Sequence, residues 1–120
     1  MRCFAALLAA LMLAAAPAAA LAHAYLKSSD PAAGASVPAS TSRLLLTFTE
    51  EVQPQFCAVT VADAMGMQAQ TAKPAPVPGH ADELTVPLHF EMGGKYTVKW
   101  DALSTDGHKT HGSFSFTVSG

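Results

Sequence analysis

Two groups of residues in this 120-residue sequence have the types and spacing of metal ligands. Asp106-Gly107-His108 sets a carboxylate and an imidazole two positions apart, with a glycine between them that permits a tight turn. His23 becomes the first residue of the chain if the segment before it is removed. A free N-terminal histidine offers its α-amine and its imidazole Nδ1, which together close a chelate ring on one ion. The amine has an ordinary pKa of about 7.7–8.0, so a strong Lewis acid displaces its proton at neutral pH.

This set of ligands favours copper(II). An amine, two imidazoles and a carboxylate complete a square plane of nitrogen and oxygen atoms, which Cu(II) prefers, and Cu(II) heads the affinity order of the divalent metals. Zinc prefers a tetrahedron, usually with more histidine or cysteine. We therefore predict one Cu(II) ion per chain at His23, Asp106 and His108. The prediction requires the start of the first strand and the loop at 104–111 to lie at the same end of the fold.

The segment before His23 has the features of an export signal. Arg2 supplies a basic start, residues 4–16 are apolar, and Pro17 interrupts any helix. Ala20-Leu21-Ala22 then places small residues at the two positions that define a cleavage site. A membrane anchor is the alternative, but a span needs about 20 consecutive apolar residues. We therefore expect cleavage directly before His23 and export to an oxidising compartment, the periplasm.

Cleavage would change both the length and the composition of the chain. Half of all residues are hydrophobic, but removal of residues 1–22 leaves a 98-residue domain of ordinary polarity at 23–120, enough for a single core. Six Lys and Arg would then face nine Asp and Glu, a net charge of −3 without a basic cluster. This charge argues against nucleic acid as a partner. Without Cys3, Cys57 has no disulfide partner in the chain and is expected to be a buried structural thiol.

Apolar and polar residues alternate through the mature domain, and no stretch has helical periodicity. The strands predicted from this alternation lie at about 25–28, 42–49, 56–61, 68–73 (a short edge strand), 83–89, 95–102 and a last run through Phe114, Phe116 and Val118. About seven short strands in a domain of this length predict an all-β sandwich. Residues 74–79 are expected to form a stiff loop, Trp100 to lie in the core, and Tyr96 to form a tyrosine corner.

The mature sequence resembles the CopC-type periplasmic copper-binding proteins, in order and over nearly its whole length. The stretches that carry the resemblance are His23–Gly34, Leu46–Val52, Gly94–Trp100, Ser104–His108 and Gly112–Val118. The resemblance implies an immunoglobulin-like Greek-key β-sandwich that binds Cu(II) through His23, Asp106 and His108. It also matches Glu50 to a strand-end acid near the copper in some members, expected to be an outer group or a weak ligand.

Other candidate ligands are expected to contribute less. His111, three residues after His108, is a possible spare ligand or outer group, whereas His80 and His89 are expected to be solvated or structural. Some members of the family carry a methionine-rich loop that binds Cu(I) through thioethers. The corresponding stretch here, Ala64–Gln68, holds two methionines, Met65 and Met67. We therefore predict a Cu(II) site only.

The resemblance implies a monomeric copper carrier, not an enzyme, that serves copper resistance, storage or delivery to an inner-membrane copper transporter of the CopD type. Two alternatives stay open. An oxidative enzyme with a copper brace also uses an N-terminal histidine, but Asp106 would here fill a position that oxygen needs. In a metal-free immunoglobulin-like interaction module, the spacing of Asp106 and His108 would be coincidental.

Overall fold

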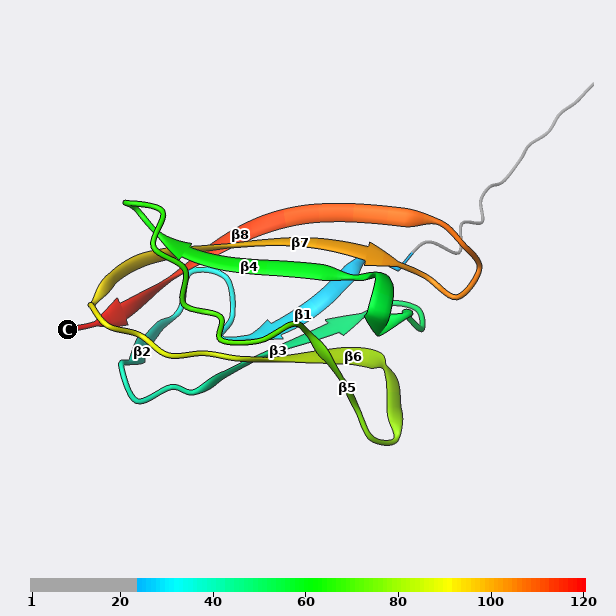
Figure 1. Cartoon of the computed structure of the whole chain (residues 1–120), viewed down its shortest axis with the longest axis horizontal. Coiled ribbons are helices and arrows are strands. Elements are labelled where there is room, and N and C mark those ends of the chain that lie inside the picture. The colour runs from blue at the N-terminus through cyan, green and yellow to red at the C-terminus, as the bar shows by residue number, and fades with distance from the viewer. Residues whose placement is uncertain (1–23) are drawn as a thin grey trace, which may run out of the picture.

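Alternating apolar side chains turn one face of each strand inward, and the strands pair into two four-stranded sheets that pack face to face (Figure 1). The computed structural model describes residues 24–120, so the predicted export signal and His23 lie outside the described residues. Within the described residues, no helix is long and apolar enough to cross a membrane.

The order of the strands is that of an immunoglobulin-like sandwich. One sheet has the order β1-β3-β6-β5, with bounds Leu26–Asp30, Arg43–Phe48, His80–Pro87 and Ala75–Val77. The other has the order β2-β8-β7-β4, with bounds Ser36–Pro38, Lys109–Ser119, Gly94–Leu103 and Ala58–Asp63. All pairings are antiparallel except that of β2 with β8. The predicted all-β sandwich is confirmed.

The core lies between the sheets and is formed by the inward positions of every long strand. Its fully buried members include Leu44, Leu46, Phe48, Val61, Leu84, Val86, Val98, Phe116 and Val118. Phe48 and Trp100 join the two sheets by an edge-to-face contact of 5.4 Å between ring centroids. The Tyr96 hydroxyl donates to the Met92 carbonyl at 2.6 Å, four residues upstream. The core position of Trp100 and the tyrosine corner are therefore confirmed.

Some predicted strand boundaries are wrong for physical reasons. Residues 68–73 form only isolated bridges, because Gln68 pairs with β4 while Gln70 pairs with Leu88 of the other sheet, so no continuous ladder forms. The expected loop at 74–79 contains β5, an edge strand in which Pro76 is tolerated.

Two further differences lie near short or proline-containing segments. The three-residue strand β2 was not predicted from the alternation, because it is too short for a period of two to be visible. The strand predicted at 56–61 begins at Ala58, because the preceding Pro54–Phe56 forms a 3-10 turn. The strand β4 therefore starts and ends two residues later than predicted.

The two ends of the sandwich hold different sets of loops (Figure 1). The proximal end, on the right, is made by the start of β1, the 49–53 loop, the β5–β6 turn and the 104–108 loop. Backbone hydrogen bonds from Val52 to Ala81 (3.1 Å) and from Thr105 to Glu51 (3.1 Å) join three of these segments. The distal end, on the left, holds the 64–67 loop, the β6–β7 connection and the C-terminus. The 104–108 loop, which carries Asp106 and His108, therefore lies at the same end as the start of the described chain.

Candidate metal centre

The loop between β7 and β8 is a tight turn built around Ser104, which is 1% exposed. The Ser104 amide donates to the His108 carbonyl at 3.0 Å, and the Gly107 amide donates to the Ser104 carbonyl at 3.0 Å. Gly107 has a φ of +90°, a conformation that side chains other than glycine adopt at a cost. The tight turn expected from the Asp-Gly-His spacing is thus present.

Within this turn, Asp106 and His108 lie side by side at the surface. Asp106 Oδ1 is 3.2 Å from His108 Nδ1, and the two side chains are 36% and 58% exposed. Bonds from a dication to imidazole nitrogen or carboxylate oxygen are about 2.0–2.2 Å long, so two atoms at this separation can occupy neighbouring positions on one ion. The pair offers one nitrogen and one oxygen ligand to solvent.

Ser104 also prepares the carboxylate for metal binding. Its hydroxyl donates to Asp106 Oδ1, which accepts a second, longer hydrogen bond from the His108 amide at 3.3 Å. The Ser104 hydroxyl is the largest cause that lowers the pKa of Asp106 below its ordinary value, with His108 adding to the effect. Asp106 is therefore ionised at neutral pH and already oriented.

The start of the described chain is fixed beside this turn. Ala24 is fully buried, and its carbonyl accepts a 2.6 Å hydrogen bond from the hydroxyl of Thr110, a buried residue two positions after His108. On the other side, the Tyr25 amide donates to Thr49 Oγ1 at 3.0 Å. The start of the first strand and the 104–108 loop therefore lie at the same end, as the predicted site requires. His23 itself precedes Ala24 and lies outside the described residues.

The 49–53 loop supports the turn from the third side. Gln53 Nε2 donates to the Ser104 carbonyl at 2.9 Å, and the Gln53 amide donates to the Leu103 carbonyl at 2.9 Å. Glu50, matched to an acid near the copper, is exposed and lines a hollow together with His80 and Asp82 at the start of β6. The backbone of this loop thus braces Ser104, while Glu50 faces a second group of ligands.

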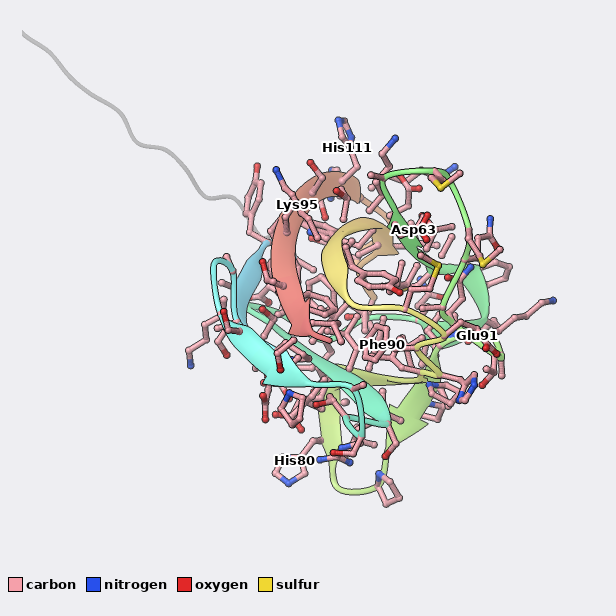
Figure 2. The ribbon with its side chains drawn as sticks, turned by 90° about the vertical axis from the view of Figure 1, so that its left-hand side faces the viewer. Asp63, His80, Phe90, Glu91, Lys95 and His111 are labelled. Atoms are coloured by element: carbon pink, nitrogen blue, oxygen red, sulfur yellow. The ribbon has the colours of Figure 1, made fainter. Side chains whose placement is uncertain are left out.

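The remaining histidines are all exposed. The sequence places His111 in the same loop as His108, but in the structure it lies in β8, where it pairs across the ladder with Asp101. Figure 2 shows His111 and His80 on opposite sides of the sandwich, both pointing outward. His80 Nδ1 lies 4.0 Å from Glu83 and His89 Nε2 lies 3.1 Å from Glu91.

Cys57 is half-buried rather than fully buried. It packs against the core, and its thiol donates to the Gln53 carbonyl at 3.3 Å. Burial raises the pKa of the thiol, so the neutral form is present at neutral pH. A packed, protonated thiol fits the predicted structural role and is a poor metal ligand in this state.

The residues that organise the site were not evident from the sequence. Gln53 and Thr110 donate to backbone carbonyls of distant segments, whereas the Ser104 hydroxyl bonds within its own loop. A hydroxyl or an amide in a strand-rich sequence gives no signal of either contact. Likewise, His80, Asp82 and Glu83 place one ligand atom each within 4.8 Å of one another, the one such group of three among residues 24–120. The spacing His-x-Asp-Glu at a turn was the available signal.

Comparisons with known proteins agree with this architecture. Residues 26–119 match the CopC domain family. The chain is 35% identical over 98 residues to Protein YobA of Escherichia coli strain K12, covering 81% of this chain and 79% of that protein. It is 33% identical over 106 residues to Copper resistance protein C of Escherichia coli, covering 82% and 83%.

A solved structure extends the agreement to three dimensions. The crystal structure of CopC from Methylosinus trichosporium OB3b superimposes with a TM-score of 0.74 at 30% identity, over 80% of this chain and 93% of that one. A family match over more than half of the chain, relatives above 30% identity and a shared sandwich all lead to the same assignment. The chain belongs to the CopC family, whose members include proteins named for copper resistance.

Proposed function

We propose that the mature protein binds one Cu(II) ion at the proximal end through the amine and imidazole of His23, the carboxylate of Asp106 and the imidazole of His108. The observation that carries the proposal is the Thr110–Ala24 hydrogen bond of 2.6 Å. This hydrogen bond joins Ala24, the residue after His23, to Thr110, which lies two positions after His108. Neighbouring Cα atoms are about 3.8 Å apart, so the amine of His23 starts within one residue of this anchor.

The state of the turn supports copper binding before any ion arrives. Asp106 is ionised at neutral pH, as an ordinary aspartate is, and the Ser104 hydroxyl lowers its pKa further, so binding does not have to displace a proton from the carboxylate. Gly107 and Gln53 hold the turn in shape, which reduces the entropy lost when the ligands are ordered around an ion. Mixed nitrogen and oxygen ligands suit Cu(II) better than the softer Cu(I).

The exposure of the pair supports a carrier rather than an enzyme. Both side chains face solvent at the tip of a loop, where a partner can approach and exchange the ion. We propose that the protein works as a monomer in the periplasm, for copper resistance, storage or delivery, with an inner-membrane copper transporter of the CopD type as its partner. The names of the copper-resistance relatives are consistent with this role.

The proposal is tested by electron paramagnetic resonance of the mature protein with one equivalent of Cu(II). We expect a tetragonal signal with nitrogen hyperfine structure, which changes in Asp106→Asn. The matched control is Asp101→Asn, an exposed aspartate that also has a histidine neighbour, His111 across the ladder. If Asp106→Asn and Asp101→Asn both leave the signal unchanged, Asp106 is not a ligand. If the unmodified protein gives no bound-copper signal, the proposed function is wrong.

A further inference from the structure

His80, Asp82 and Glu83 form a second group of ligands at the proximal end. One ligand atom from each lies within 4.8 Å of the others. The three residues lie in the first four positions of β6, directly after the β5–β6 turn, where Gly79 has a φ of +80°. They do not belong to the loop that carries Asp106 and His108, so they are a separate feature of the fold.

Glu83 is held in position by the neighbouring strand. Its side chain is 19% exposed, and Oε2 accepts a 3.0 Å hydrogen bond from the Thr47 hydroxyl, its register partner on β3. The other oxygen, Oε1, lies 4.0 Å from His80 Nδ1. One oxygen is therefore anchored to the sheet while the second is directed toward the imidazole, which is the way a carboxylate ligand is oriented by an outer hydrogen bond.

The surroundings add negative charge. His80 and Asp82 line a surface hollow of about 390 Å³ together with Glu50 and Glu51 of the 49–53 loop. Within residues 24–120, no lysine or arginine forms an ion pair with Glu83 or with any of the three carboxylates that line this hollow, since the ion pairs there all involve histidine. The hollow thus concentrates unpaired negative charge beside an imidazole, and a cation is the ligand that compensates it.

We propose that this group is a second metal site, which takes a divalent transition metal ion of the Zn(II) or Cu(II) type. The imidazole selects such ions over Mg²⁺ and Ca²⁺, which prefer oxygen ligands alone. Metal-ligand bonds of about 2.0–2.2 Å place the ligands of a tetrahedral ion about 3.4 Å apart, so side-chain movements of about one ångström or more bring the three atoms into range. Water completes the coordination, and the exposed His80 makes this site weaker than a site with a chelating N-terminus.

The inference does not depend on the proposed copper site, and a titration separates the two. The mature protein is first loaded with one equivalent of Cu(II) and is then titrated with Zn(II) by calorimetry. We expect one Zn(II) to bind, and His80→Ala or Asp82→Asn to weaken that binding by about tenfold or more. The matched control is His89→Ala, an exposed histidine with only one carboxylate neighbour, Glu91 at 3.1 Å, which should change the affinity by less than about twofold.

Each contrary outcome overturns the inference. If Zn(II) does not bind, or binds equally well to His80→Ala, Asp82→Asn and the unmodified protein, there is no metal site at the β5–β6 turn. If Zn(II) binding is lost in His108→Ala but retained in His80→Ala, the ion occupies the copper site, and only the second site is refuted. A measurement without mutation supports the same decision: a second equivalent of Cu(II) should broaden the amide resonances of residues 79–83, and resonances that stay sharp contradict the proposal.

Discussion

At the proximal end, an aspartate in a tight turn lies beside an imidazole; at the distal end, an aspartate accepts hydrogen bonds from the amides of two methionines. Asp106 Oδ1 accepts from the Ser104 hydroxyl and the His108 amide, whereas Asp63 Oδ1 accepts from the amides of Met65 and Met67, both at 2.9 Å. Figure 2 looks onto the distal end, where Asp63 is labelled. Similar backbone hydrogen bonding therefore presents different ligands at the two ends.

The difference lies in what supplements each turn. The proximal turn is backed by the start of β1 and by Gln53, and a second histidine-carboxylate group lies at the same end, at the start of β6. In the distal turn, Met65 and Met67 are 87% and 57% exposed. Thioethers bind soft ions such as Cu(I), and two of them at an open loop provide few ligands. The comparison predicts that copper(II) binding depends on the proximal end alone.

The largest effect is expected for His108→Ala. Loss of one imidazole ligand next to Asp106 should weaken Cu(II) binding by about 100-fold. The fold should be retained, because the side chain is 58% exposed. Competition titration against a chelator of known affinity gives the dissociation constant, and circular dichroism reports the fold. His111→Ala, which removes an exposed histidine from β8, serves as the control. An equal loss of Cu(II) affinity in both variants would contradict the prediction, because it would mean that His108 is no more important for binding than another exposed histidine.

A smaller effect, about tenfold, is expected for Ser104→Ala. Without the hydroxyl, the pKa of Asp106 rises back toward its ordinary value, and the carboxylate loses its orientation. Because the Ser104 hydroxyl lowers the pKa of Asp106, the carboxylate of the unmodified protein stays ionised below the ordinary aspartate pKa of about 3.9, whereas that of the variant takes up a proton near the ordinary value. The variant should therefore lose the Asp106 ligand at a higher pH than the unmodified protein as the solution is acidified. Titrations between pH 3 and 7 measure this. Ser115→Ala, which removes a hydroxyl bonded to Thr97 at 3.1 Å, is the control. Parallel pH curves for unmodified protein and Ser104→Ala would argue against this role of Ser104.

Thr110→Val should change Cu(II) affinity by only a few-fold. The substitution keeps the shape of a buried side chain but removes the hydrogen bond to the Ala24 carbonyl, which costs about 1–3 kcal/mol of folding stability because that carbonyl is left without this donor. The start of β1 then loses one of its anchors beside the turn. Denaturant unfolding and copper titration measure the two effects. Unchanged stability and unchanged affinity together would show that this hydrogen bond does not position the N-terminus.

No effect on Cu(II) affinity is expected for the double variant Met65→Ala/Met67→Ala. Both side chains are at the distal end and more than half exposed. The same pair tests the prediction of a Cu(II) site only. A tight Cu(I) site under reducing conditions that disappears in the double variant would show that the distal end also binds copper, and the contrast between the ends would then be one of oxidation state.

Much of the fold was predictable because it depends on local alternation. Leu44, Leu46 and Phe48 occupy every second position and are all buried, so the period of two alone placed β3. The strand β2 and the edge strand β5 could not be predicted from the alternation, since each has only three residues and contains a proline. Their pairing is decided by neighbours far away in the sequence.

The site divides in the same way. Asp106 and His108 are two residues apart, so the sequence alone showed that one turn presents both. The hydrogen bond from Thr110 to Ala24 spans 86 residues, and no local pattern encodes it. The group at His80 was also missed: Glu83 lies on β6 with His80, and the hydrogen bond that holds its other oxygen comes from Thr47 of β3, 36 residues away. Residues that bind can thus be read from local spacing, whereas residues that position depend on the tertiary structure.

The central claim is that export processing creates a copper ligand at His23, and a comparison of two chains tests it directly. The dissociation constant for Cu(II) is measured for a chain that begins at His23 and for one that begins at Ala22. The extra residue converts the amine of His23 into an amide but leaves Asp106, His108 and the fold in place. We predict that the longer chain binds Cu(II) about 100-fold more weakly or worse. Equal affinity of the two folded chains would contradict the account.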